Sequence, residues 1–412
     1  MQVKTLLVID IGNLHLANRL NLNYNDHTMT TLFPPSIIGI IGGGQLGNMM
    51  IYRSKKLGFR FAVLDGADAP AQALADFFTE GSLKDAAALQ RLARASDIMT
   101  YEIEHINTDA LDDLYANGHQ LYPSPAALRT IQDKLSQKEL FVKKGIPTAA
   151  FFAESSPSTA DFSAKKFPLV QKTRRGGYDG RGVRVLQNAE DTPMPAPSLF
   201  EDMVDIDKEL AVMVARGRDG SLAVFPVAEM AFNPDHNICD TVIAPARIDE
   251  KTAAAAREIS VSVVQALDGV GIFGVELFLD KQGNVLLNEV APRPHNSGHY
   301  TMEACVTCQF EQHVRAITGL PFGDTTLMRP AVMLNLLGQP GSAGTPVIQG
   351  YEEAVKVPGL SMHLYGKTDC RPFRKMGHFT VSAPTLEEAL ERAEYARGIL
   401  KISGDKPVGE AK

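Results

Sequence analysis

Gly271-Ile-Phe-Gly-Val-Glu-Leu-Phe-Leu279 is an apolar run with one carboxylate, Glu276, where a buried strand would carry a hydrophobic side chain. Lys281-Gln-Gly-Asn284 is typical of a tight turn, and Val285-Leu-Leu-Asn-Glu-Val290 follows as a second apolar run. The pattern therefore predicts a β-hairpin in which Glu276 and Glu289 lie toward the same end of one sheet.

The two glutamates of this hairpin, with the neighbouring Asn288, would supply hard oxygen ligands. Such ligands suit Mg²⁺ held between the protein and nucleotide phosphates. Either glutamate taken alone could be a solvated residue at a sheet edge. Because both interrupt apolar runs, and because a buried carboxylate needs a cation, the sequence favours Glu276 and Glu289 as metal ligands.

The composition is that of an ordinary globular protein with more than one domain. The chain has 412 residues, of which 44% are apolar and 22% charged, and this length suggests two or three domains. The formal net charge is -7 and no long block of Lys and Arg occurs. These features argue against nucleic acid as a partner.

The cysteines and the hydropathy pattern point to a cytoplasmic location. Four cysteines in so long a chain do not form a disulfide framework, which favours a reducing compartment. Cys305 and Cys308 form a C-x-x-C pair, but no second pair stands at zinc-binding spacing, so structural or incidental thiols are expected. No apolar run approaches the roughly 18 residues of a membrane span, and the N-terminus makes a poor signal peptide.

The order of predicted elements gives an α/β and α+β chain in four parts. Residues 1–35 are an extension that is either disordered or precedes a natural start at Met29; 36–125 form a Rossmann-like domain of strand, glycine turn, helix and strand. Residues 126–325 hold the hairpin, and 326–412 form a small mixed domain that ends in a helix. Within the second domain we expect one helix over 126–145 and one strand over 223–229.

A first glycine loop, Gly42-x-Gly44-x-x-Gly47, stands between a predicted strand and helix, and Asp65 ends the next strand. This pattern fits the dinucleotide-binding fingerprint and would indicate an NAD-dependent dehydrogenase. Its physical content is narrower, because glycines simply let backbone amides approach any anion at a helix N-terminus. Nothing later in the chain supplies a site for hydride transfer.

A second glycine loop, residues 176–182, is flanked by strands on both sides and is therefore a hairpin flap rather than a P-loop. Such a flap could lay backbone N–H groups over triphosphate oxygens while Lys172, on the preceding strand, neutralises charge. A flexible surface hairpin is the alternative. Together with Lys134, Glu209 and the two hairpin glutamates, the flap predicts a nucleotide–Mg²⁺ site.

With these pieces the chain resembles the ATP-grasp carboxylate–amine ligases, and among them the 5-(carboxyamino)imidazole ribonucleotide synthases of de novo purine synthesis. The resemblance runs from about Ile37 to Leu400. It is carried by Gly42-Gly-Gly-Gln-Leu-Gly47, Tyr101-Glu-Ile-Glu-His105, Asp133-Lys-Leu-Ser-Gln-Lys138, Gly176-Gly-Tyr-Asp-Gly-Arg-Gly182, Asn288-Glu-Val-Ala-Pro-Arg-Pro-His-Asn-Ser-Gly-His299, His363-Leu-Tyr-Gly-Lys367 and Arg374-Lys-Met-Gly-His378.

The resemblance implies an ATP-grasp fold behind an N-terminal Rossmann-like pre-ATP-grasp domain, with a C-terminal domain that helps to bind the substrate phosphate. It implies that bicarbonate attacks ATP to give carboxyphosphate, whose carboxyl group then passes to 5-aminoimidazole ribonucleotide. ATP and Mg²⁺ are the expected cofactors, and a homodimer the expected assembly. The alternative within the superfamily is an acyl-phosphate ligase that uses a different acid or amine, for instance formate.

The resemblance also assigns residues to each ligand. ATP would contact Lys134, Lys172, Gly177, Tyr178, Asp179, Gly180, Arg181, Gly182, Glu201, Val204, Glu209, Asn288 and Glu289. Mg²⁺ would be held by Glu276 and Glu289, and the imidazole ribonucleotide by Gln45, Glu102, Asp179, Arg181, Lys367, Arg374 and Lys375. The catalytic set would be Arg293, His295 and Asn296, beside bicarbonate, and Tyr178 as a lid that excludes water.

Two positions depart from the family's pattern. Phe232 stands where relatives often carry a polar residue near the nucleotide, and Phe373 where glycine is usual. Neither removes a charged group, so they affect local loop shape rather than the expected reaction.

Overall fold

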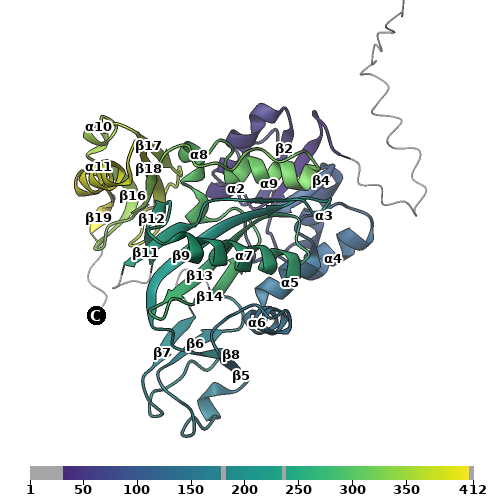
Figure 1. Ribbon diagram of the computed structural model, residues 1–412. Helices are drawn as coiled ribbons and strands as arrows, with labels where there is room; N and C mark the ends of the chain where they lie inside the picture. The colour runs from purple at the N-terminus through teal and green to yellow at the C-terminus, as the bar shows by residue number, and fades with distance from the viewer. Residues whose placement is uncertain (1–30, 178–181, 234–237, 408–412) are drawn as a thin grey trace, which may run out of the picture. The chain divides into compact units, whose positions relative to one another are not determined.

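The computed structural model describes residues 31–177, 182–233 and 238–407 (Figure 1). Its N-terminal part is a four-stranded parallel sheet in the order β3-β2-β1-β4. The elements of this part are β1 (Ile37–Ile41), α2 (Gln45–Ser54), η1 (Lys55–Leu57), β2 (Arg60–Asp65), β3 (Phe77–Glu80), α3 (Ala86–Arg94), β4 (Ile98–Tyr101), α4 (Thr108–Ala116) and α5 (Pro125–Gln132).

Helices cover both faces of this sheet, which explains why its central strands are apolar on both sides. On one face the side chains of β1 and β2 pack with α2 and with α9 (Gln309–Thr318), a helix from much later in the chain. On the other face they pack with α3, α4 and α5. The predicted strand–glycine turn–helix–strand unit is confirmed, whereas β3 and α4 lacked a clear pattern in the sequence.

The single helix expected over residues 126–145 is wrong, because the chain breaks at Asp133 into α5 and α6 (Lys134–Lys143). Asp133 has extended backbone angles, φ -115° and ψ 106°, and its carboxylate accepts the backbone N–H of Leu135 as the N-cap of α6. The same carboxylate accepts hydrogen bonds from Nε and Nη2 of Arg174, at 3.1 and 2.7 Å. One buried acid therefore begins α6 and joins it to the end of β6 (Leu169–Thr173).

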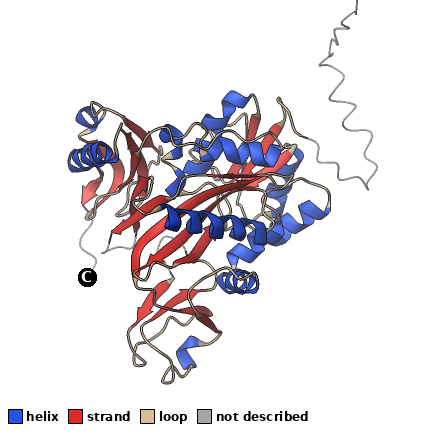
Figure 2. Ribbon diagram, in the orientation of Figure 1, coloured by secondary structure: helices blue, strands red, loops and turns tan. Residues whose placement is uncertain are grey.

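The second sheet has nine strands in the order β14-β13-β9-β11-β12-β15-β18-β17, with β10 paired to β9, and all the pairings are antiparallel (Figure 2). Its strands are β9 (Ile206–Arg216), β10 (Leu222–Val224), β11 (Ala228–Asn233), β12 (Ile238–Ala244), β13 (Gly271–Asp280), β14 (Val285–Ala291), β15 (Ala331–Leu337), β17 (Leu360–Leu364) and β18 (Lys375–Ser382). The strand expected over 223–229 is therefore two strands, β10 and β11. Pro226 lies between them and has no N–H for a ladder.

The helix α7 (Glu250–Ala266) lies on one face of β9, β13 and β14 (Figure 1). Phe273, Val275, Leu277 and Leu279 of β13 all point into the core beneath it. Because side chains alternate along a strand, Gly274 and Glu276 point to the opposite face. That face is where the functional side chains gather.

A third sheet, β5-β8-β6-β7, carries the glycine flap and has a small core of its own. It contains β5 (Phe151–Glu154), the short helix η2 (Pro157–Thr159), β6, β7 (Val183–Leu186) and β8 (Ser198–Asp202). β6 and β7 pair antiparallel, so the hairpin expected around residues 176–182 is confirmed at its base.

The C-terminal strands β15, β18 and β17 continue the nine-stranded sheet through the pairing of β12 with β15. The remaining elements are η3 (Asn296–Gly298), α8 (Thr301–Ala304), β16 (Ser342–Gln349), α10 (Tyr351–Ala354), α11 (Leu386–Ile399) and β19 (Lys401–Pro407). α11 packs on β15 and β18 and confirms the helix predicted near the C-terminus, but β19 follows it, so the domain does not end in a helix. The division expected at residue 326 stays a prediction, and the sheet runs across it.

We expect the Asp133→Ala variant to unfold more easily than wild type. It removes the cap of α6, a loss of about 1–2 kcal/mol, and also the partner of Arg174. Asp133→Asn is the matched control, since asparagine caps a helix but cannot form the ion pair. Urea titration of the three proteins would contradict the assignment if the alanine variant were no less stable than the asparagine variant.

The same contact predicts a pH dependence. Burial raises the pKa of Asp133, but the hydrogen bond and charge of Arg174 outweigh it and hold the pKa below its ordinary value. The stabilisation is therefore complete above the unfolded pKa of about 4 and is lost as the pH falls through the folded pKa. The difference in unfolding free energy between wild type and Asp133→Asn should shrink below about pH 4.

Candidate nucleotide and metal site

The hairpin places its two glutamates directly opposite each other. Glu276 of β13 is the register partner of Glu289 of β14 on one side and of Ala211 of β9 on the other. Cross-strand partners project from the same face, and Glu209, two residues before Ala211, shares that face. Three carboxylates from neighbouring strands therefore gather on the face opposite α7, and the predicted convergence of the glutamate pair is confirmed.

A β-bulge explains why Asn288 belongs to this group. The register between the strands shifts after Glu276, because Leu277 pairs with Leu287 and leaves Asn288 as an extra residue of β14. A bulge brings two successive side chains toward one side of a strand. Leu287 and Val290 both lie in the core beneath α7, so Asn288 and Glu289 are both left to face the site.

The protonation equilibria of the three carboxylates show an excess of negative charge. Burial and the neighbouring Glu289 and Glu209 raise the pKa of Glu276 well above its ordinary value. Burial likewise raises the pKa of Glu209 to about 7. Lys134, in contrast, holds the pKa of Glu289 low. A cation bound beside Glu276 and Glu289 would relieve this excess of negative charge.

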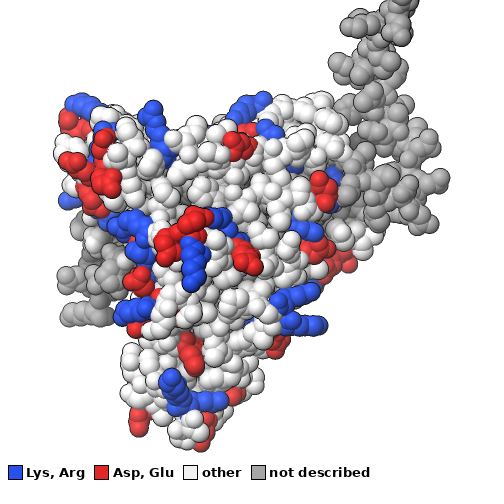
Figure 3. Space-filling model, viewed as in Figure 1, with Lys and Arg blue, Asp and Glu red and all other residues white. Residues whose placement is uncertain are grey.

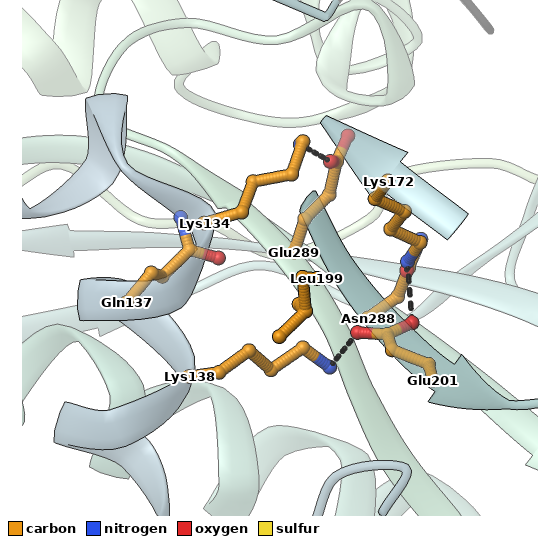
Figure 4. A pocket seen from close by; sticks show the side chains of 8 residues that line it. All are labelled: Lys134, Gln137, Lys138, Lys172, Leu199, Glu201, Asn288 and Glu289. Carbon is orange, nitrogen blue, oxygen red and sulfur yellow. Dashed lines mark hydrogen bonds and ion pairs between the residues drawn. The ribbon is translucent and has the colours of Figure 1, made fainter. Parts of the chain in front are cut away.

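Lysines from two other elements reach the Asn288–Glu289 side of this group (Figure 4). Lys134, at the start of α6, donates to Oε2 of Glu289 at 2.9 Å. Lys172, on β6, donates to Oδ1 of Asn288 at 2.8 Å and pairs with Oε2 of Glu201 on β8, also at 2.8 Å. These residues line one pocket between the hairpin, α6 and the third sheet, as the sequence predicts for Lys134, Lys172, Asn288 and Glu289.

His295 lies over the sheet beside Glu276. Its Nε2 is 3.4 Å from Oε1 of Glu276, and its Nδ1 is 2.9 Å from Oγ of Ser297. This approach depends on Gly274, since a Cβ there would stand 2.5 Å from the Cβ of His295. Because Gly274 and Glu276 lie two apart on one face, the missing side chain makes room for the ring directly beside the carboxylate.

The other two residues of the predicted catalytic stretch have well-defined partners. Arg293 Nε forms an ion pair with Oε1 of Glu104 at 2.8 Å, which joins it to the loop after β4. Asn296 and Asn335 of β15 exchange two side-chain amide hydrogen bonds, both of 2.8 Å. The stretch is thus held from the first sheet on one side and from the C-terminal strands on the other.

The first glycine loop is occupied by carboxylates of the chain itself. Glu102, which is 8% exposed, accepts the N–H of Gly44 through Oε1 and that of Gly47 through Oε2, each at 2.5 Å. Asp65 accepts the N–H of Gly43 at 2.6 Å. The amides that a pyrophosphate would need are already bonded, so the dehydrogenase interpretation is wrong. Gln45 lies at the mouth of this loop as the first residue of α2.

The three basic residues predicted to grip a phosphate lie together after β17 and at the start of β18. Lys367 donates to the carbonyl of Lys375 at 2.7 Å, and Arg374 donates to the carbonyl of Asp369. Burial and the neighbouring glutamates raise the pKa of Glu276, and the charge of Lys375 partly offsets that rise, so Lys375 lies near these carboxylates. Phe373, the family departure, has a positive φ of 62°, the backbone conformation for which glycine is preferred.

Some residues predicted to bind ATP lie outside the described residues, or at the end of a described range. Tyr178, Asp179, Gly180 and Arg181 lie outside the described residues. Gly177 and Gly182 stand at the base of the flap, where Thr173 donates its N–H to the carbonyl of Gly182 at 2.8 Å. Val204 is half-buried in the link between β8 and β9.

Four residues of the site were given no role from the sequence. Gly274 and Asn335 carried no clear signal, and Asp133 and Lys138 stood in a family motif without a role of their own. Each acts through a contact with a distant segment, so no local pattern marks it. A glycine inside an apolar strand was the one available hint, since such a glycine often permits close approach of another group.

Few other candidate sites stand among the described residues. No group of three or more His, Cys, Asp or Glu side chains there is arranged to hold a metal. The four cysteines are free, as expected, and no described helix is long and apolar enough to cross a membrane. On the face seen in Figure 3, basic and acidic side chains are interspersed rather than gathered into one broad basic surface.

Three family models match the chain in succession. A ribonucleotide synthetase preATP-grasp domain matches residues 36–132, and an ATP-grasp domain matches residues 139–310. A phosphoribosylaminoimidazole carboxylase C-terminal domain matches residues 331–392. The order of these domains is the one that the sequence resemblance predicts.

Individual proteins match over most of the chain. An N5-carboxyaminoimidazole ribonucleotide synthase of Synechococcus elongatus is 39% identical over 379 residues, which are 89% of this chain and 94% of the relative. The solved structure of the synthetase from Thermotoga maritima has a TM-score of 0.84 and 50% identity, and covers 90% of this chain and 100% of that one.

A synthase from Aspergillus clavatus, solved in complex with ADP and 5-aminoimidazole ribonucleotide, has a TM-score of 0.81 and 34% identity. That match covers 89% of this chain and 99% of the other. With these relatives, this domain order and this site, the chain belongs to the N5-carboxyaminoimidazole ribonucleotide synthase family.

Proposed function

We infer that this protein catalyses the ATP-dependent carboxylation of 5-aminoimidazole ribonucleotide in purine biosynthesis. The observation that carries the inference is the face shared by Glu276 and Glu289, opposite Lys134 and Lys172 and beside His295. Bicarbonate attacks the γ-phosphorus of ATP, so that ADP leaves and carboxyphosphate forms. The exocyclic amine of the ribonucleotide then takes the carboxyl group, and phosphate is released.

The carboxylate cluster fits Mg²⁺ bound together with nucleotide phosphates. Mg²⁺ commonly takes one or two protein carboxylates and completes its shell with phosphates and water, so Glu276 and Glu289 suffice without a third ligand. When bound, the ion would neutralise charge that develops on the transferred phosphoryl group. Lys134 and Lys172 would exchange their present partners for phosphate oxygens, while Glu201, Val204 and Glu209 would border the nucleoside.

The side of the site around His295 is suited to bicarbonate and carboxyphosphate. Arg293 supplies a positive charge for an anion, and His295 and Asn296 supply hydrogen-bonding groups. Gln45 and Glu102 at the first glycine loop would face the imidazole ribonucleotide, and Lys367, Arg374 and Lys375 its 5′-phosphate. For the flap residues Tyr178, Asp179 and Arg181 the proposal rests on the family resemblance alone.

A homodimer and a cytoplasmic location belong to this proposal as well, and the family supports the first. The alternative substrate, formate, is tested by the same assay. ADP release should require both bicarbonate and 5-aminoimidazole ribonucleotide, and ¹³C-bicarbonate should label the product. ATP hydrolysis that needs neither substrate, or equal turnover with formate, would contradict the proposed function.

We expect Glu289→Gln to lower kcat by about 100-fold or more, because it removes a negative charge from the metal and nucleotide site. The control is Glu250→Gln, which changes a glutamate whose side chain is 82% exposed on α7. Steady-state kinetics and thermal melts of both variants test the assignment. It fails if Glu289→Gln melts at a much lower temperature while it keeps nearly wild-type activity.

We expect Gly274→Ala to lower kcat by about 100-fold, because the new Cβ displaces His295 and small misplacements of a catalytic group are costly. Gly398→Ala, on α11 with open space at its Cβ, is the matched control and should keep full activity. Turnover at saturating bicarbonate is the measurement. Wild-type turnover in Gly274→Ala would show that the position of His295 is unimportant.

A further inference from the structure

Lys138 is a buried lysine in the site to which the proposed reaction assigns no task. Its side chain is 4% exposed, and its Nζ lies 2.7 Å from Oε1 of Glu201. The same nitrogen donates to Oγ1 of Thr148 and, at 3.4 Å, to the carbonyl of Leu287. All three donors of the ammonium group thus have partners within the chain.

The carboxylate that Lys138 binds is shared between two lysines (Figure 4). Glu201 is 3% exposed, and while Oε1 contacts Lys138, Oε2 contacts Lys172 at 2.8 Å. Two positive charges therefore meet one negative charge in a nearly dry environment. The triad keeps a net positive charge beside the pocket that all three residues line, and Lys172 also reaches Asn288 there.

Stability alone is a poor reason to bury this lysine. Burial lowers the pKa of Lys138, which shows that the surroundings disfavour its charge. Buried ion pairs often add little stability over apolar residues of similar volume. α6 already has its own cap at Asp133 and core contacts such as Phe141. The position of the charge relative to Glu201 and Lys172 calls for a functional explanation.

We propose that Lys138 is a positioning residue that shares Glu201 with Lys172, so that Lys172 keeps an uncompensated positive charge for a nucleotide phosphate. Without Lys138, the whole charge of Glu201 would fall on Lys172. A phosphate would then have to compete with a buried carboxylate for the same ammonium group. The inference rests on the proposed function only in that Lys172 contacts the phosphates.

The test is the affinity of the purified full chain for Mg²⁺-ADP, measured by titration calorimetry in Lys138→Met. Methionine keeps the length and apolar stem of the side chain and removes the charge. We expect the dissociation constant to rise about tenfold or more, and the KM for ATP to rise while the KM for 5-aminoimidazole ribonucleotide stays unchanged. Lys143→Met, an exposed lysine on the same helix, is the control and should leave both values at wild type.

A second pair of variants separates charge from packing. Lys138→Met/Glu201→Gln is compared with Glu201→Gln alone, so that any contact of Glu201 with the nucleotide is lost in both proteins. Because Lys138 acts through the carboxylate of Glu201, these two proteins should bind Mg²⁺-ADP within about threefold of each other, whether or not Lys138→Met folds by itself.

Either of two results would overturn the proposal. One is wild-type affinity for Mg²⁺-ADP in a folded Lys138→Met protein. The other is a Lys138→Met/Glu201→Gln protein that binds Mg²⁺-ADP about tenfold more weakly than Glu201→Gln alone. Binding of ADP needs neither bicarbonate nor the ribonucleotide. A failure of the proposed carboxylation would therefore appear in the turnover assay and leave this test unaffected.

Discussion

The register of the β13–β14 hairpin is the constraint on which the site depends. It sets Glu276 opposite Glu289 on the face away from α7. The bulge at Asn288 places the side chain of Asn288 on that face as well. A slip by one residue would exchange the core and site faces of a strand. The hydrophobic side chains under α7 forbid such a slip, because it would bury the carboxylates and expose the core.

The charges that gather on this face explain much of the surrounding structure. Burial and the neighbouring glutamates raise the pKa values of Glu276 and Glu209, while Lys134 of α6 pairs with Glu289 and Lys172 of β6 reaches Asn288. α6 and β6 are themselves joined by Asp133 and Arg174. The acids, the bases and the contact that holds them in place thus form one connected network, which a nucleotide and its metal ion would enter by exchanging partners.

Much of the fold and of the site could be predicted from the sequence. Hydrophobic runs and turns located the β13–β14 hairpin, the first βαβ unit and α11, because each is a local pattern. The helix break at Asp133 could not be predicted, since residues on both sides favour a helix and the break is stabilised by Arg174, forty-one positions away. The dinucleotide site suggested by the first glycine loop was wrong for a similar reason. Glu102, fifty-five residues beyond Gly47, accepts hydrogen bonds from the backbone amides of that loop.

The sequence by itself determined the class of chemistry: two acids on a hairpin, a glycine flap, paired lysines and a run of motifs typical of one ligase family. These are signals of residue type and spacing, which a chain carries without folding. Only the tertiary structure decided how the charges are paired. Lys138, Glu201 and Lys172 come from three separate elements, and which carboxylate each lysine meets depends on how a helix and two sheets pack together. Electrostatic energy varies with distance and burial, and the amino-acid sequence does not specify either one directly.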